Sequence, residues 1–220
     1  MTHDSFQRRF LLFLLPVFLL APWIPAAPVP PTISYRRVFR GSSPEFIEIK
    51  ITEPGNATYD IRQLEQDAEP QSFEVGASVR QKIIELTREL KNFDITGLDL
   101  QKRIANLGEK TFRYEQGSET HETTFNYTLN TSANQLMQIF EGLARQQGDL
   151  TLLVRSVKYD RLGVNDALRQ FQSDMDHRLL PEPERLLAVL DQIAADSHFV
   201  EIARTRARAL AERIRTASPN

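Results

Sequence analysis

The spacing of the apolar residues changes along this chain, and that change constrains the fold more than any other feature. Apolar and polar residues alternate over 47–51, which indicates a β-strand with one buried face. The segment 53–56, Glu-Pro-Gly-Asn, has the composition of a turn, and the alternation resumes over 57–61. The sequence therefore predicts a β-hairpin over residues 47–61.

More strands and one helix are expected in the same region. Residues 33–39 can add a short strand, and aromatic residues on either side of Gly117 predict a second hairpin. Its strands carry Phe112 and Tyr114, then Phe125 and Tyr127. Between the hairpins, Ser78 and Gln81 match a capping box, which marks the start of a helix. Its apolar stripe, which we expect to lie across the sheet, comprises Val79, Ile83, Leu86 and Leu90.

From Thr131 onward the apolar residues follow a helical spacing. The segment 132–135 matches another capping box, and Gly148 is expected to break or kink the helix that follows. Further helical stripes occupy 164–175 and 186–193. The last stripe comprises Val200, Ala203, Ala207, Leu210 and Ile214. Short loops between successive stripes predict antiparallel helix packing.

Together these patterns predict an α+β fold, in which a small antiparallel sheet with a packed helix precedes an all-helical C-terminal half. The expected organisation has four parts: a signal peptide at 1–27, a proline-rich linker that can include a short strand at 28–44, an α+β domain at 45–130 and a helical domain at 131–216.

The first 27 residues resemble an export signal. Arg8 and Arg9 precede an apolar run, and the small residues Ala26 and Ala27 follow it. The run is about 15 residues long and contains two prolines, whereas a membrane-spanning helix needs roughly 20 residues. We expect cleavage near Ala26, export to the periplasm and no stable membrane span afterwards. The alternative is an uncleaved N-terminal anchor.

Composition excludes several classes of protein. The chain has no cysteine, which rules out disulfides, thiolate metal sites and a cysteine nucleophile. An exported chain without cysteine favours the bacterial envelope. The formal charge of −2 becomes −3 when the signal peptide is removed, so no overall attraction to nucleic acid is expected.

Common catalytic motifs are also missing. The sequence has no G-x-S-x-G elbow, P-loop, G-x-G-x-x-G or H-E-x-x-H motif. His121 and Glu122 are neighbours on an expected strand and point to opposite faces. Asp174 and His177 can share a helix face, but a histidine at a helix C-terminus is already favoured by the helix dipole. The sequence therefore predicts no catalytic residue, no metal ligand and no cofactor.

Arginines are concentrated near the C-terminus. Three of them, Arg204, Arg208 and Arg215, are spaced so that they share one flank of a helix. They can form a basic face for an envelope protein or an anionic polymer. The alternative is an ordinary solvated face opposite the apolar stripe, because Glu201 and Glu212 dilute the positive charge.

Four segments resemble uncharacterised exported bacterial proteins, and together they cover most of the chain after the signal. They are Tyr35–Ile51, Ile104–Tyr114, Phe125–Thr128 and Tyr159–Asn165. The first half is also similar to a small sheet-plus-helix domain of unknown function. Neither resemblance implies an activity or a role for any residue.

Two hypotheses about function follow. The first is a non-enzymatic binding or structural module of the envelope. The second is a carboxylate-dependent hydrolase with its site in a groove between the two halves. Buried carboxylates that converge in such a groove and have shifted pKa values would favour the hydrolase.

Overall fold

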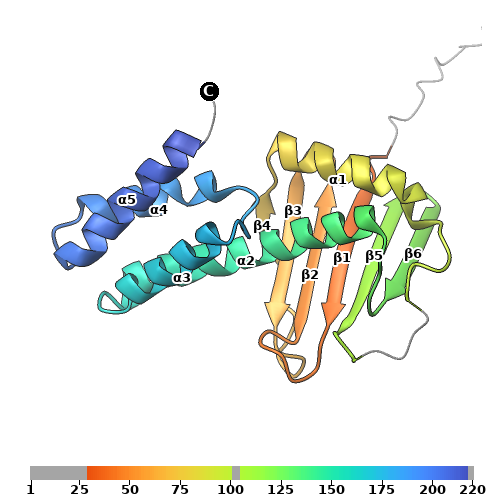
Figure 1. The fold of residues 1–220 in the computed structure, drawn as a ribbon, viewed down its shortest axis with the longest axis horizontal. Coiled ribbons are helices and arrows are strands. Elements are labelled where there is room, and N and C mark those ends of the chain that lie inside the picture. Colours follow the sequence, from red (N-terminus) through yellow and green to blue (C-terminus); the bar gives the residue numbers. More distant parts are fainter. Residues whose placement is uncertain (1–28, 101–104, 218–220) are drawn as a thin grey trace, which may run out of the picture.

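The computed structural model describes residues 29–100 and 105–217, so the expected signal peptide lies outside the described residues. Within this part, an antiparallel sheet covered by two helices precedes a helical extension (Figure 1), which confirms the predicted α+β fold. The strands are β1 (Thr32–Val38), β2 (Phe46–Thr52), β3 (Asn56–Arg62), β4 (Gln71–Glu74), β5 (Glu109–Gln116) and β6 (Glu119–Phe125). The α-helices are α1 (Ala77–Glu89), α2 (Thr131–Tyr159), α3 (Val164–Asp176), α4 (Leu187–Ala195) and α5 (Glu201–Ala217), with 3-10 turns η1 (Lys91–Phe93) and η2 (Pro183–Leu186).

Strand β1 occupies the middle of the sheet, although the sequence indicates only a short strand within a linker. The strand order is β4-β3-β2-β1-β5-β6, and β1 pairs antiparallel with both β2 and β5. Ile33 and Tyr35 of β1 are buried beneath the helices. Part of the expected linker therefore belongs to the core of the sheet.

The first predicted hairpin is confirmed in its register. Ile47 pairs with Ile61 and Ile49 pairs with Tyr59, as the alternation requires. The second hairpin, β5 with β6, also forms, and Phe112 and Phe125 are buried. Tyr127 was expected on its return strand, but β6 ends at Phe125 and Tyr127 is exposed.

Helices α1 and α2 cover one face of the sheet (Figure 1). Ile83, Leu86 and Leu90 are buried there, which confirms most of the predicted α1 stripe, although Val79 is only partly buried. Helix α2 is held across the sheet by Glu141. Its carboxylate accepts hydrogen bonds from the Tyr35 hydroxyl (2.5 Å) and the Arg37 guanidinium (2.8 Å). The opposite face of the sheet is polar, as at neighbouring Ser34, Lys50 and Arg113.

Both predicted capping boxes are wrong. Gly76, not Ser78, precedes α1, and Asn130, not Ser132, caps α2 by accepting a hydrogen bond from the Ala133 amide (2.9 Å). The Ser132 hydroxyl instead donates to Glu89 on α1. An N-cap needs an extended backbone conformation as well as a polar side chain, and the serines lie within the helices that the chain forms.

Helix α2 is continuous over 29 residues, so the expected break at Gly148 is wrong. Its two ends belong to different hydrophobic clusters: residues up to Ala144 pack with the sheet, and Leu153 packs with α3, α4 and α5. Packing at both ends outweighs the roughly 1 kcal/mol that a mid-helix glycine costs relative to alanine. The boundary between the two hydrophobic cores therefore lies within α2 and not at the start of this helix.

The helical half is tied to the sheet half through Glu182, whose side chain is almost fully buried. Its carboxylate accepts hydrogen bonds from the Gly76 amide at the start of α1 (2.6 Å) and from Arg185 Nε (2.9 Å). The amide of Glu182 donates to the side-chain oxygen of Gln146 on α2 (2.9 Å). A Cβ on Gly76 would collide with the Glu182 carboxylate, so this close approach requires glycine.

The C-terminal helices follow the predicted stripes with one change. Leu186, Leu190 and Ile193 are buried, as are four of the five residues expected for α5. Val200 is exposed instead, and Phe199 is buried beside it in the sequence. Among the described helices, none combines the length and apolar character needed to cross a bilayer.

Candidate functional site

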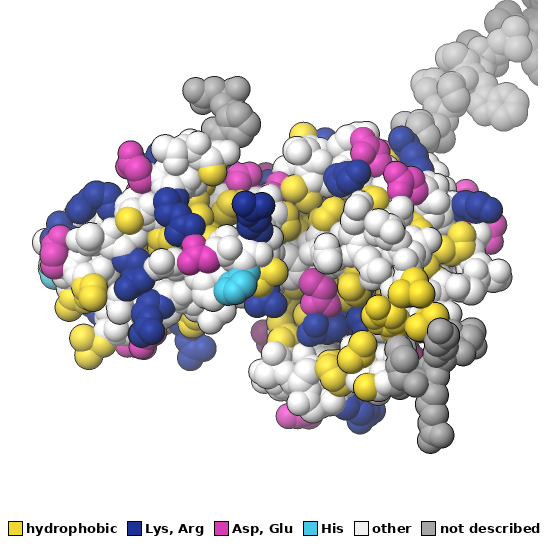
Figure 2. Space-filling model, in the orientation of Figure 1, with side chains coloured by type: hydrophobic (Ala, Val, Ile, Leu, Met, Phe, Trp, Pro, Cys, Tyr) yellow, Lys and Arg dark blue, Asp and Glu magenta, His cyan; other side chains and the backbone are white. Residues whose placement is uncertain are grey.

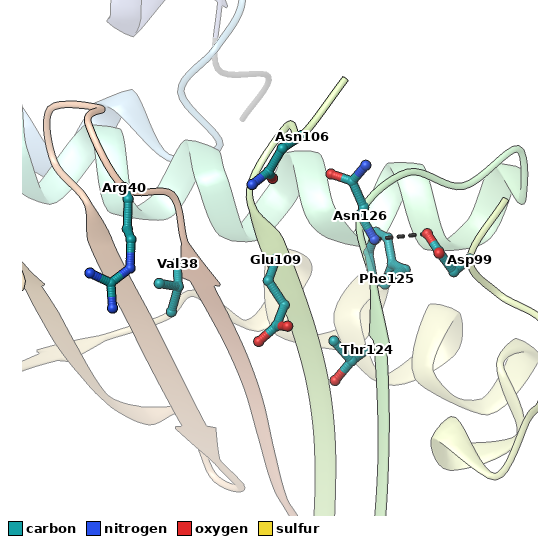
Figure 3. Close-up of a pocket in the computed structure, with 8 residues that line it drawn as sticks. All are labelled: Val38, Arg40, Asp99, Asn106, Glu109, Thr124, Phe125 and Asn126. Carbon is teal, nitrogen blue, oxygen red and sulfur yellow. Dashed lines mark hydrogen bonds between the residues drawn. The ribbon is translucent and has the colours of Figure 1, made fainter. Parts of the chain in front are cut away.

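One pocket of about 490 Å³ opens at the end of the sheet where β1, β5 and β6 meet the connecting loops (Figure 3). Its Asp99 carboxylate accepts hydrogen bonds from the Asn126 amide (2.8 Å) and the Tyr127 amide (3.1 Å). The Asn126 side chain accepts from the Leu107 amide (2.7 Å). These polar groups hold the loops together, so they are not free to converge on a ligand.

A larger hollow of about 720 Å³ lies between the segment 59–71 and α2 at Gly148 and Thr151. It corresponds to the groove in which the hydrolase hypothesis places its site. Its acidic lining comprises Asp60, Glu65, Asp67 and Glu69. Asp60 is paired with Arg62 (3.0 Å). Across residues 29–100 and 105–217, no cluster of three or more His, Asp or Glu side chains is placed to hold a metal ion.

A buried carboxyl pair lies between α2 and α3, formed by Asp149 and Asp174. Asp149 is 6% exposed and its Oδ2 atom has no hydrogen-bond partner among the described residues. Burial raises the pKa of Asp149 to about 7, and the adjacent carboxyl group of Asp174 acts in the same direction. Asp174 accepts hydrogen bonds from Arg145 (3.3 Å) and Gln170 (3.0 Å).

Sequence reasoning considered Asp174 with His177 and missed Asp149. The structure separates the histidine from the pair: its Nδ1 lies 2.7 Å from the Ser173 carbonyl, and the side chain is exposed. Neither carboxyl group lines the two hollows described above. A raised pKa is what a general acid needs, but substrate has no open route to this pair through those hollows.

The three arginines proposed as a basic face lie on α5, where ion pairs offset two of them. Arg204 donates to Glu201 (2.8 Å), and Arg215 donates to both carboxylate oxygens of Asp191 on α4 (2.7 and 2.6 Å). Arg208 is exposed, and no ion pair to it occurs in the described part of the chain. The flank therefore carries much less free positive charge than the sequence suggests.

Exposed apolar side chains gather at the end of the helical half farthest from the sheet, here called the distal end. It consists of the α2–α3 connection and the start of α5, with Tyr159 (72% exposed), Leu162 (83%), Val200 (47%) and Ile202 (60%). The two parts lie together in Figure 1. Arg206 of α5 donates to Asn165 at the start of α3 (3.2 Å).

Hydrophobic and basic side chains lie next to each other at this end, at the left of Figure 2. In the sequence, the last turns of α2 and the connection after it carry Arg155, Lys158 and Arg161, and the first turn of α5 carries Arg204. Sequence reasoning used only the inward stripe of α2, Leu150, Leu153 and Val157. The signal that it missed is that Leu152, Val154 and Tyr159 make the same segment apolar on its outer side as well.

Comparison with known proteins adds no assignment, since no family model and no curated protein matches the chain.

Proposed function

We propose that this chain is an exported, non-catalytic binding module of the bacterial envelope and that its distal end is the binding surface. The observation that carries the proposal is the group of exposed apolar side chains on that end. Tyr159 and Leu162 are each more than 70% exposed and are only three residues apart. Apolar groups clustered in water mark interaction sites, because contact with a partner removes that surface from solvent.

The arrangement of the helices supports this role. The sheet half is joined to the extension through Glu182 and the continuous helix α2, so packed helices hold the distal end away from the sheet. A surface built on packed helices keeps its side chains in place before a partner arrives, which lowers the entropy lost on binding.

The hydrolase hypothesis has one favourable observation, the raised pKa of Asp149 in the buried carboxyl pair. The second requirement is a groove in which that pair faces a substrate, and neither of the two hollows described above is lined by the pair. The acidic hollow beside Gly148 is the nearest candidate, but Asp149 and Asp174 are not part of its lining. A binding role explains more of the exposed surface than a catalytic role does.

The test is site-specific photo-crosslinking in the native bacterial envelope. A photoreactive benzoylphenylalanine replaces Leu162 at the distal end or Leu129 in the loop before α2, a matched leucine that is 69% exposed. We expect crosslinked lipid or protein from position 162 and not from position 129. The intact mass of the recovered chain also tests export, with an expected start near Ala27. Equal crosslinking from both positions, or none from position 162, would refute the proposed function.

A further inference from the structure

We propose that the distal end docks on the surface of an anionic phospholipid bilayer. This inference rests on the proposed function and names its partner. Tyr159, Leu162 and Ile202 would enter the interfacial region, and Arg155, Lys158 and Arg161 would contact the lipid phosphates.

The positive charge at this end is available for a partner. Within residues 29–100 and 105–217, Arg155, Lys158 and Arg161 form no ion pair within 4 Å. Lys158 lies over the ring of its neighbour Tyr159, 5.0 Å from the ring centre, so charge and apolar surface adjoin. Arg161 lies near enough to Asp196 to add to the lowering of the Asp196 pKa that hydrogen bonds from His198 produce.

The acidic residues at the same end are engaged in local contacts. Asp160 accepts a hydrogen bond from the Gly163 amide (3.0 Å), and Asp196 accepts from the His198 amide (2.9 Å). Glu201 accepts from Arg204 (2.8 Å). These hydrogen bonds and this ion pair stabilise the α2–α3 and α4–α5 connections. Asp166, at the start of α3, is exposed and lies 3.7 Å from Arg169. Within the part of the chain that the structure describes, Arg155, Lys158 and Arg161 have no such ion pair and adjoin exposed apolar groups, which complements an anionic lipid surface.

The shape of the distal end favours a bilayer over a protein groove. Tyr159 and Leu162 lie at a helix end and in the connection after it, and each is more than 70% exposed, so both can enter an apolar layer without a matching pocket. Arginine and lysine beside such residues can lay their aliphatic stems along the apolar layer while the charge reaches the phosphates. The chain as a whole has a formal charge of −2, so its overall charge gives no attraction to an anionic surface.

The experiment is co-sedimentation of the purified protein with vesicles of phosphatidylglycerol or of phosphatidylcholine. The charge variant is Arg155→Gln, Lys158→Gln and Arg161→Gln together. Its matched control removes three exposed charges from the sheet half: Lys82→Gln, Arg88→Gln and Lys91→Gln. A third variant, Tyr159→Ser with Leu162→Ser, removes the apolar groups. An unchanged thermal melting curve verifies that each variant is folded.

We expect the wild-type protein to bind phosphatidylglycerol vesicles, to release them as salt rises and to bind phosphatidylcholine weakly. Each basic residue near an anionic surface is worth about fivefold in binding, so the charge variant loses on the order of 100-fold while the control binds as the wild type does. The Tyr159 and Leu162 variant loses at least about tenfold.

Three results would overturn the proposal: equal binding to both vesicle types, equal loss in the charge variant and its control, or no binding to vesicles at all. If position 162 crosslinks to a protein while vesicles are not bound, the lipid proposal fails and the binding module stands. If the apolar variant changes the gel-filtration volume and vesicles are not bound, a second copy covers the distal end and the lipid proposal is wrong.

Discussion

The buried carboxyl pair makes the stability of this protein depend on pH, and Asp149→Asn isolates its contribution. Asparagine has the shape of the protonated acid and can donate a hydrogen bond to Asp174 in its place. The ordinary pKa of an aspartate is 3.8, and in the folded chain the pKa of Asp149 is about 7. A folded pKa above the unfolded one means that the folded state binds the proton more tightly. The free energy of unfolding therefore falls as pH rises from about 4 to 7.

The size of this effect follows from the two pKa values. A difference of about three units corresponds to about 4 kcal/mol between the limits of low and high pH. Between about pH 5 and pH 8 the wild-type protein should lose about 2.5 kcal/mol through this group. Asp174 and Arg145 are the charged groups that act on the pKa of Asp149, and Gln170 donates to Asp174; all three remain in the variant.

Urea denaturation of both proteins at several pH values tests the reasoning. The difference in unfolding free energy between Asp149→Asn and the wild type should shift by about 2.5 kcal/mol in favour of the variant from about pH 5 to pH 8. Asp166→Asn is the control, because Asp166 is an exposed aspartate on α3 and its removal should leave the pH profile unchanged. Parallel profiles for Asp149→Asn and the wild type would refute the argument.

Three other experiments test the fold and the arginine flank. Ile49→Ala should lower the free energy of unfolding by about 2–5 kcal/mol in urea denaturation, because Ile49 is fully buried. Lys50→Ala should change it by no more than about 0.5 kcal/mol. Equal effects would mean that the buried face of the strand is misassigned. Glu182→Gln should cost about 1.5–3 kcal/mol in the same assay, because an amide cannot accept from both Gly76 and Arg185, and a change near zero would count against this tie between the halves. The third variant replaces three arginines of α5 with glutamine: Arg204, Arg208 and Arg215. It should bind vesicles as the wild type does, and a large loss of binding would mean that this flank of α5 is the binding surface.

The failed predictions share a physical cause. The capping boxes at Ser78 and Ser132 are short patterns that ignore backbone conformation, and the break expected at Gly148 ignores the packing at both ends of α2. Asp149 and Asp174 are 25 positions apart in the chain. No local pattern relates them, because their proximity results from the packing of α3 against α2.

Alternation of apolar and polar residues determined the two hairpins, and helical spacing determined the inward faces of α1, α3 and α4. Both patterns are local, because they depend only on which face of one strand or helix is apolar enough to be buried. Tertiary structure alone decided that β1 lies at the centre of the sheet, because strand order depends on contacts between distant segments. It also decided that α2 serves two cores, that Asp149 shares a site with Asp174, and that Tyr159 and Leu162 stay in water beside Ile202. The sequence shows how apolar each segment is, but only the packed helices show which of those apolar faces has no neighbour.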